Sequence, residues 1–247
     1  MRSLIIAKRV AKQIWQDKRT LALMFLAPIF IFALLEIVLV VEKNGIRNAS
    51  AFNHMAPHLL AYLVFFFVFL ISGIAFLRER INGTLERLFI SPVSEYEIVL
   101  GYFLGFGLFV TIQTVMIQLF LLFVLEVPNE SHFLLMLLVN LLLAATALSI
   151  GILCSAFART EFQLIQFIPI VIVPQIIFAG MFDITHVPDF VLNLSKIMPM
   201  PYGSNALYQL MMHATTIHDI IYDILILIVF VFVFQVLATL IIRKNKA

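Results

Sequence analysis

The segment RERINGTLERLFISPVSEYEIVLGYFLG, residues 78–105, decides how this chain folds. It carries charged side chains between two apolar runs, at about 59–77 and 98–125, that are each long enough to cross a bilayer as a helix. The whole chain is 63% hydrophobic and 12% charged, with a mean hydropathy of +1.08, which leaves too little polar surface to cover a soluble globule. The sequence therefore predicts an integral membrane protein with a polar segment between two spans.

The first part of this segment predicts a short helix outside the membrane. Asn82-Gly83 indicates the end of the preceding helix, and Thr84 is expected to cap a helix over 85–90, LERLFI. That helix must stop before Pro92, because the residue before a proline avoids helical geometry. A surface loop that lies on the membrane is the alternative explanation for its apolar residues.

The second part of the segment predicts the start of another long helix. Ser94 and Glu97 have the spacing of a capping box, in which each residue satisfies a backbone N–H of the other. Residues 78–97 are therefore expected to form a loop that contains its own short helix.

Six apolar runs of spanning length predict six transmembrane helices. The runs are continuously apolar, whereas strands of a membrane barrel alternate and are about half as long. We expect an all-α membrane protein with a single domain over residues 1–247. The predicted spans lie at about 20–41, 59–77, 98–125, 133–157, 162–182 and 221–242.

Lysine and arginine residues predict the orientation, because cytoplasmic segments retain positive charge during insertion. With the N-terminus inside, 13 of the 16 basic residues lie in inner segments, that is, all except Lys43, Arg47 and Lys196. Both termini are therefore expected in the cytoplasm and the protein in the cytoplasmic (inner) membrane. The net charge of +2 reflects this topology, and no basic run with interleaved aromatic residues indicates nucleic-acid binding.

Residues 1–19 show the periodicity of an amphipathic helix. Val10 and Ile14 fall on one side of it and Lys8 falls on the other. Such a helix is expected in the inner interface, with Trp15 at headgroup depth and its basic face toward anionic lipid. The alternative is that these are only the flanking charges of the first span.

The last outer loop, at 183–219, contains an unusual apolar element. Residues 187–199, VPDFVLNLSKIMP, are too short to cross the bilayer. Non-helical backbone at membrane depth is tolerated only where protein or a water-lined cavity covers it. We expect a re-entrant element beside the outer mouth, or else an amphipathic surface helix. Pro169 and Pro174 predict a kink in the run that precedes it.

A few polar side chains inside the apolar runs are candidates to line a translocation path. An intramembrane acid is costly, but Glu36 lies close to the outer end of its run, where interfacial hydration is the alternative explanation. The amides are also compatible with hydrogen bonds between helices. The candidate path residues are Glu36, Gln113, Gln118 and Gln175, with Asn140 and Gln235 as further amides of this kind.

Other patterns indicate packing rather than chemistry. Gly101 and Gly105 form a small-xxx-small pair that lets another helix approach closely, from the same subunit or from a second one. Cys154 is the single cysteine and is expected to be a core residue. His54 and His58 have i, i+4 spacing, but no third ligand for a metal ion is near.

The charged segment resembles the pattern RERxxGTLExLxxSPVxxxE of the type-2 ABC transporter permease family. FAGMF at 178–182 and MPMPYGSNAL at 198–207 are similar to the outer element of this family. Glu95 and Tyr102 stand where relatives often carry basic residues, a difference expected to bear on which ATPase fits the loop. The pattern is matched at Arg78, Glu79, Arg80, Gly83, Thr84, Leu85, Glu86, Leu88, Ser91, Pro92, Val93 and Glu97.

The resemblance implies a mechanism. In this family two permease subunits pair around a path, and a coupling helix in each docks onto an ATP-binding dimer whose closure moves the spans. The implied partners are a separate ABC ATP-binding subunit, a second permease subunit (identical or different) and membrane lipid. ATP and Mg²⁺ are expected in the ATPase, because this chain has no GxxxxGK[ST] phosphate loop. The implied coupling helix comprises Gly83, Thr84, Leu85, Glu86, Arg87, Leu88 and Phe89.

The resemblance also implies export of a hydrophobic or amphiphilic substrate, such as a drug, a lipid or a saccharide-linked lipid, by a subunit that is not itself an enzyme. A secondary transporter or channel is the first alternative, but it should carry buried ion-coupling carboxylates or internal repeats. An intramembrane enzyme is the second alternative, and no nucleophile with a base or metal motif is evident within the spans.

Overall fold

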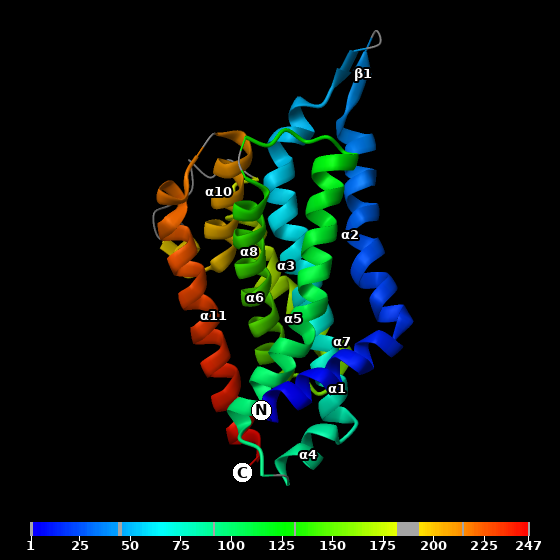
Figure 1. The fold of residues 1–247 in the computed structure, drawn as a ribbon, viewed down its shortest axis with the longest axis vertical. Coiled ribbons are helices and arrows are strands. Elements are labelled where there is room, and N and C mark those ends of the chain that lie inside the picture. The colour runs from blue at the N-terminus through cyan, green and yellow to red at the C-terminus, as the bar shows by residue number, and fades with distance from the viewer. Residues whose placement is uncertain are drawn as a thin grey trace.

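The computed structural model describes residues 2–43, 46–90, 92–130, 132–181, 193–213 and 215–246. Long helices run side by side, and a two-stranded hairpin is the one exception to the helical fold among the described residues (Figure 1). This confirms the expected helical membrane class. Five helices are long and apolar enough to cross a membrane: α2 (Lys18–Leu39), α3 (Ser50–Ile81), α5 (Glu95–Leu119) with its π-helical continuation η1 (Phe120–Val124), α6 (Phe133–Phe157) and α11 (Ile217–Lys246).

The two ends of the bundle carry different elements (Figure 1). The short helix α4 (Thr84–Phe89), both ends of the chain and helix α1 (Arg2–Gln16) lie at one end, which we call the α4 end. Helix α10 (Pro199–Met212) and the hairpin of β1 (Val41–Lys43) and β2 (Ile46–Asn48) lie at the other, the α10 end.

Helices α3 and α6 form the centre of the bundle. The most apolar stretch of α3 is 67% buried and that of α6 is 56% buried, against 17% each for α2 and α11. Glycines allow the two backbones to cross closely, because a Cβ on Gly151 would lie 2.7 Å from the carbonyl oxygen of Phe69. The helices α2 and α11 lie outside this centre, and their low buried share leaves broad apolar faces exposed within the subunit.

Helix α3 begins at Ser50, nine residues before the predicted span at 59–77. The predicted span starts near residue 59 because the continuous apolar run begins there. In the structure Pro57 lies inside α3 and is buried with Phe52 and Ala56. Packing of this turn offsets the single backbone hydrogen bond that proline cannot donate.

The fifth apolar run, predicted as a span at 162–182, does not form one spanning helix among the described residues. It forms α7 (Glu161–Ile165) and α8 (Ile168–Ile177), which together extend about 25 Å against a hydrocarbon core of about 30 Å. Pro169 lies in the first turn of α8, where a missing N–H costs little. The expected kink is thus a break in the helix, and the count of six spans stays a prediction.

Helix α10 occupies a region that the sequence predicted as loop. Six of the thirteen residues of the expected re-entrant element at 187–199, those at 187–192, lie outside the described residues. The helix itself begins at Pro199, because proline favours the first helical position. With 14 residues α10 is too short to cross, and Met200 and Leu210 are fully buried against its neighbours.

Helix α1 packs its apolar face onto α5, within the predicted range 1–19. Its buried side chains include Ile6 and Val10. A Cβ on Gly101 would lie 2.7 Å from Cβ of Ile6, and one on Gly105 would lie 2.8 Å from Cβ of Val10. The small-residue pair therefore receives a helix of the same subunit, which settles an alternative that the sequence left open.

Candidate functional site

Helix α4 follows α3 through a sharp glycine turn. Gly83 has a φ of 70°, in the left-handed region that glycine adopts at little cost. Gly83 is therefore the N-cap of α4, and Thr84 is the first helical residue rather than the predicted cap. The turn breaks the helix at the position that Asn82-Gly83 indicated in the sequence.

The two faces of α4 differ. Leu85 is 3% exposed and anchors the helix to the body of the protein. Glu86 and Arg87 are exposed, and Ile90 directly after the helix is 86% exposed. The remaining side chains of the predicted coupling helix, Thr84, Leu88 and Phe89, are partly buried. An anchored helix with an exposed charged face is available for a partner, and its coupling role stays a prediction.

Helix α5 begins with the predicted capping box. The backbone N–H of Glu97 donates to Oγ of Ser94 at 3.3 Å, and the backbone N–H of Ser94 donates to Oε2 of Glu97 at 3.0 Å. The Arg2 guanidinium of α1 donates to the carbonyl oxygen of Pro92, just before this box. The loop that follows α4 is thus tied to both α1 and α5.

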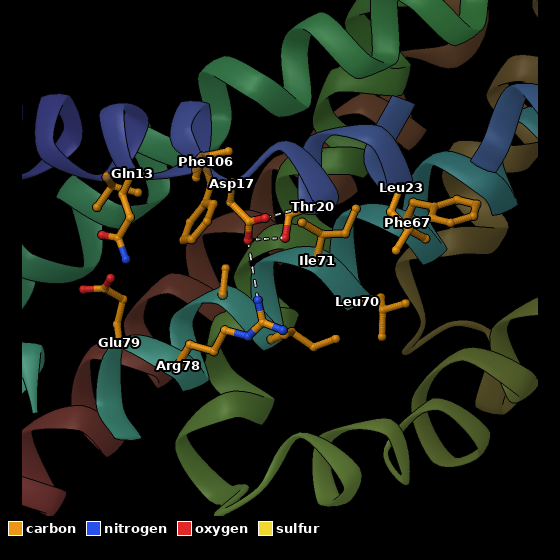
Figure 2. A pocket seen from close by; sticks show the side chains of 14 residues that line it. Gln13, Asp17, Thr20, Leu23, Phe67, Leu70, Ile71, Arg78, Glu79 and Phe106 are labelled. Atoms are coloured by element: carbon orange, nitrogen blue, oxygen red, sulfur yellow. Dashed lines mark hydrogen bonds and ion pairs between the residues drawn. The ribbon is translucent and has the colours of Figure 1, made fainter. Parts of the chain in front are cut away.

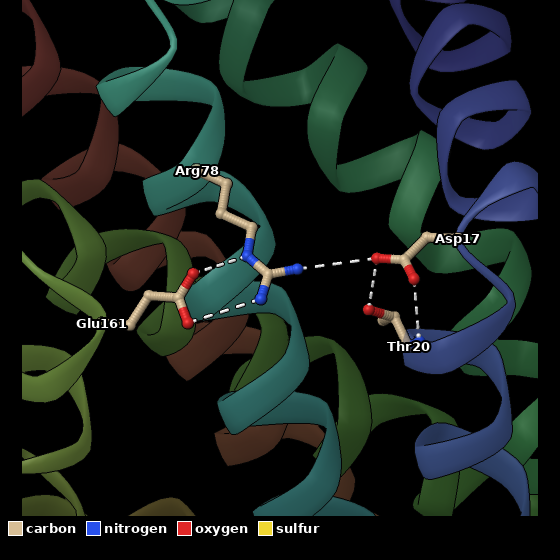
Figure 3. A network of polar contacts seen from close by, with 4 residues as sticks. All are labelled: Asp17, Thr20, Arg78 and Glu161. Atoms are coloured by element: carbon tan, nitrogen blue, oxygen red, sulfur yellow. Dashed lines mark hydrogen bonds and ion pairs between the residues drawn. The ribbon is translucent and has the colours of Figure 1, made fainter.

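Arg78, in the last turn of α3, joins two other segments (Figure 3). Its Nε donates to Oε1 of Glu161 at 2.6 Å and its Nη2 donates to Oε2 at 3.4 Å, which is a bidentate pair with the start of α7. Its Nη1 lies 3.6 Å from Oδ2 of Asp17, between α1 and α2. Hydrogen bonds from the hydroxyl and the backbone N–H of Thr20 hold the pKa of Asp17 below its usual range.

Glu79 is buried in a second charged contact, at 3% exposure. The Tyr102 hydroxyl donates to Oε2 of Glu79 at 2.7 Å, and Nη2 of Arg9 donates to the same oxygen at 3.1 Å. Nη2 of Arg9 also lies 2.6 Å from the Tyr102 oxygen. This triangle joins α3, α5 and α1. The guanidinium and the hydroxyl together compensate for the cost of burying a carboxylate.

Arg80 contacts the end of α6. Its Nη2 donates to the carbonyl oxygen of Ala158 at 3.0 Å, and its Nη1 donates to that of Ser155. The last carbonyls of a helix have no partners within the helix, so an arginine side chain is a suitable donor to them.

Arg78, Glu79 and Arg80 together form what we call the RER junction. Successive residues of an α-helix point about 100° apart, so three charges in a row reach three sides of α3. From the sequence we named these three residues as part of the family pattern but missed their contacts. The signal available was the run of three charges itself. The RER junction lies directly before α4 and connects this end of α3 to α1, α5, α6 and α7.

Tyr102 has an internal role that its departure from the family pattern did not suggest. Its ring is fully buried and lies 4.8 Å from the ring of Phe76, centre to centre. Its hydroxyl donates a hydrogen bond to Glu79 in the interior and does not contribute to the exposed face of α4.

The three glutamines of the predicted path are buried, and two of them, Gln118 and Gln175, link elements of the subunit. Nε2 of Gln118 donates to the carbonyl oxygen of Phe133 at 3.0 Å, and Oε1 of Gln118 accepts from Asn140 at 3.3 Å. Oε1 of Gln175 accepts from the backbone N–H of Met200 at 3.2 Å, which holds α8 to the start of α10.

The remaining polar candidates have different surroundings. Gln113 is fully buried, and neither its amide nitrogen nor its oxygen has a hydrogen-bond partner among the described residues. Nε2 of Gln235 donates to the Ser149 hydroxyl at 3.1 Å, and Glu36 is half-buried on α2. Path lining by Glu36, Gln113 and the two linking glutamines stays a prediction.

The two histidines of α3 contact α10 separately. The Ser204 hydroxyl donates to the carbonyl oxygen of Ala179 at 2.6 Å, so it accepts from Nδ1 of His58 at 2.7 Å. Nε2 of His54 lies 3.0 Å from the Tyr208 hydroxyl. The described residues contain no group of three metal-ligating side chains.

Asp223 is a buried acid that sequence reasoning did not single out. It is 7% exposed, and its Oδ2 accepts from Nδ2 of Asn205 at 3.2 Å, which joins α11 to α10. Because α11 begins at Ile217, Asp223 lies well inside the helix rather than at the edge of the predicted run.

Comparison with known proteins shows what this architecture is similar to. The profile of the family described as ABC-2 type transporter matches residues 2–212. ABC transporter G family member 20 of Dictyostelium discoideum is 27% identical over 70% of this chain and 24% of its own length. Inner membrane transport permease YhhJ of Escherichia coli (strain K12) is 34% identical over 52% of this chain and 35% of its own length. Probable multidrug ABC transporter permease YbhR of the same strain is 21% identical over 68% of this chain and 46% of its own length.

The chain spans between a quarter and a half of the length of these relatives. The family match extends from α1 to the end of α10, and thus includes the RER junction and α4. A match over most of the chain, together with the spanning helices, establishes the family. The chain belongs to the ABC-2 type transporter family.

Proposed function

We propose that this chain is the membrane-spanning permease subunit of an ATP-driven ABC exporter, and that a separate ABC ATP-binding subunit docks on α4. The observation that carries the proposal is the exposed pair Glu86-Arg87 on α4, directly after the RER junction. Membership of the ABC-2 type transporter family supports it, because permeases of this family generally work with such a subunit.

The contacts of the RER junction supply a mechanism for coupling. When the ATP-binding subunits close, the push on α4 reaches α3 across the turn at Gly83. Arg78 passes the displacement to Glu161 at the start of α7 and to Asp17 between α1 and α2. The bidentate contact with Glu161 constrains the orientation of α7 relative to α3 as well as their distance, because two parallel hydrogen bonds hold the carboxylate.

The orientation and assembly follow from the same proposal. The α4 end faces the cytoplasm of a cytoplasmic (inner) membrane, and both termini lie there, in agreement with the distribution of the basic residues. A second permease subunit, identical or homologous, pairs through α2 or α11. These spans have the largest apolar surface left uncovered within the subunit.

The cargo we propose is hydrophobic or amphiphilic: a drug, a lipid or a saccharide-linked lipid. Two of the relatives are named as a probable multidrug ABC transporter permease and an inner membrane transport permease, which supports this class. Within the path, Gln113 is the residue best suited to hydrogen-bond a polar group of the cargo, because its amide makes no hydrogen bond among the described residues. ATP and Mg²⁺ belong to the ATP-binding subunit.

The test is charge reversal on α4 in the reconstituted complex. We expect Glu86→Lys/Arg87→Glu to lower the stimulation of ATPase activity by a panel of lipids, saccharide-lipids and hydrophobic drugs at least ten-fold, while the protein still inserts. Lys196→Glu is the matched control, because Lys196 lies in an exposed turn ahead of α10, at the opposite end. Full stimulation with the reversed charges would exclude α4 as the docking element.

A further inference from the structure

A cavity of about 170 Å³ lies at the α4 end between α1, α2, α3 and α5 (Figure 2). Its lining is divided into a polar and an apolar end. In Figure 2 Gln13 and Glu79 point toward one another at one end, whereas Leu23, Phe67 and Leu70 gather at the other. A cavity with this division fits an amphiphile better than a uniformly polar or apolar ligand.

The polar end carries a surplus of negative charge. Two carboxylates, Asp17 and Glu79, line it together with one guanidinium, that of Arg78. Their partners outside the lining, Glu161 and Arg9, add one charge of each sign, so a surplus of one negative charge remains. A cationic group is therefore favoured there.

The polar end also offers a donor to an anion. Nη1 of Arg78 lies 3.6 Å from Oδ2 of Asp17, which is longer than an N–H···O hydrogen bond of about 2.7–3.2 Å. The Nη1 hydrogens therefore remain available to an acceptor. A phosphate oxygen and an ammonium group have complementary partners within one site.

The length of the cavity matches one leaflet of a bilayer. From Arg78 to Phe67 along α3 is about 16 Å at the helical rise, or roughly half of a hydrocarbon core about 30 Å thick. The polar end lies beside α1, whose exposed face is basic, and the apolar end lies toward the middle of the bundle. Ile71 and Ile74 line the stretch between them.

We propose that this cavity binds a zwitterionic bilayer phospholipid with an ammonium headgroup, of the phosphatidylethanolamine type. The phosphate accepts from Nη1 of Arg78, and the ammonium group donates to Asp17 and Gln13. The cavity takes the headgroup and the first methylenes, and the acyl chains continue past Leu70 into the bilayer. The site does not depend on docking of an ATPase at α4. The site lies at the α4 end, which the proposed orientation places in the inner leaflet, and only this choice of leaflet rests on the proposed function.

The test measures lipid retention by native mass spectrometry of the purified chain, exchanged into detergent with defined additives. The probes are phosphatidylethanolamine, phosphatidylglycerol and dodecyltrimethylammonium. We expect phosphatidylethanolamine to be retained about five-fold more than phosphatidylglycerol, as one additional ion pair predicts.

Two variants and a control locate the site. Asp17→Asn removes the charge but keeps the N-cap of α2, because asparagine caps as well as aspartate, and it should abolish the preference. Ile74→Trp fills the cavity and should do the same. Asp219→Asn removes a comparable carboxylate, bonded to Thr216 N–H at 2.8 Å, at the other end of the molecule, and should have no effect.

Thermal unfolding of each variant tests whether it is folded. If Ile74→Trp does not fold, the lipid preference of Asp17→Asn alone tests the proposal. Equal retention of the two phospholipids, or an unchanged preference in Asp17→Asn, would overturn the proposal. Stronger retention of dodecyltrimethylammonium than of phosphatidylethanolamine would overturn it too, because the occupant would then be a free cationic amphiphile. None of these measurements requires ATP, so they stand apart from the test of coupling.

Discussion

Gly101 and Gly107 lie on the same helix, α5, but have opposite surroundings. A Cβ on Gly101 would lie 2.7 Å from Ile6 and 3.0 Å from the carbonyl oxygen of Ser3, whereas a Cβ on Gly107 meets nothing within 4 Å. We expect Gly101→Ala to lower the free energy of unfolding by about 1–3 kcal/mol, because α1 must move away. Gly107→Ala should leave it unchanged or raise it by up to about 1 kcal/mol through helix propensity.

Thermal unfolding in detergent compares the two alanine variants directly. Equal melting temperatures would mean that α1 does not pack on α5 as closely as the glycine contacts indicate.

Tyr102 contributes a single hydroxyl to the charged triangle with Glu79 and Arg9. Tyr102→Phe keeps the ring and removes this donor from a buried carboxylate. We therefore expect a loss of about 1.5–3 kcal/mol in the free energy of unfolding, the range for hydrogen bonds to charged groups. Tyr222→Phe, on the exposed face of α11, is the control and should change it by less than about 0.5 kcal/mol. A loss in the control as large as that at Tyr102 would count against the triangle.

At the scale of elements, the pair of Arg78 and Glu161 connects α3 to α7. Arg78→Lys keeps the charge but cannot form the two parallel hydrogen bonds, since lysine offers a point charge. We expect substrate stimulation of the partner ATPase to fall about ten-fold or more, with insertion into the membrane retained.

A double-mutant cycle with Glu161→Gln separates this pair from the other contacts of Arg78. If the pair transmits motion, the double variant should be no worse than the more damaging single variant. Additive losses would show that the two residues act independently.

Elements defined by one local pattern were predictable from the sequence. The run at 133–157 coincides with α6, and the capping box at Ser94 starts α5, because length, hydrophobicity and cap chemistry act within a few residues. Helix α10 was not predictable in this way, because its prolines indicate a break unless tertiary packing supports the helix after them. The partners of the RER junction lie far away in the sequence, and only the folded bundle brings them together.

At the scale of the whole molecule, the distribution of basic residues predicts which end faces the cytoplasm. Arg87→Cys on α4 should resist a membrane-impermeant maleimide in intact cells and react in inside-out vesicles. Lys196→Cys, in the exposed turn before α10, should show the reverse. The single native cysteine, Cys154, is buried and should give little background in either preparation. Labelling of both positions from one side would contradict the proposed topology.

The central claim is that α4 receives an ABC ATP-binding subunit, and the contact itself is the most direct measurement of it. A photo-crosslinking amino acid in place of Ile90, which is 86% exposed beside α4, should capture an ABC ATP-binding protein in native membranes. The same amino acid in place of Tyr222, 67% exposed on α11, should capture none. Capture from Tyr222 but not from Ile90, or from neither position, would contradict the account.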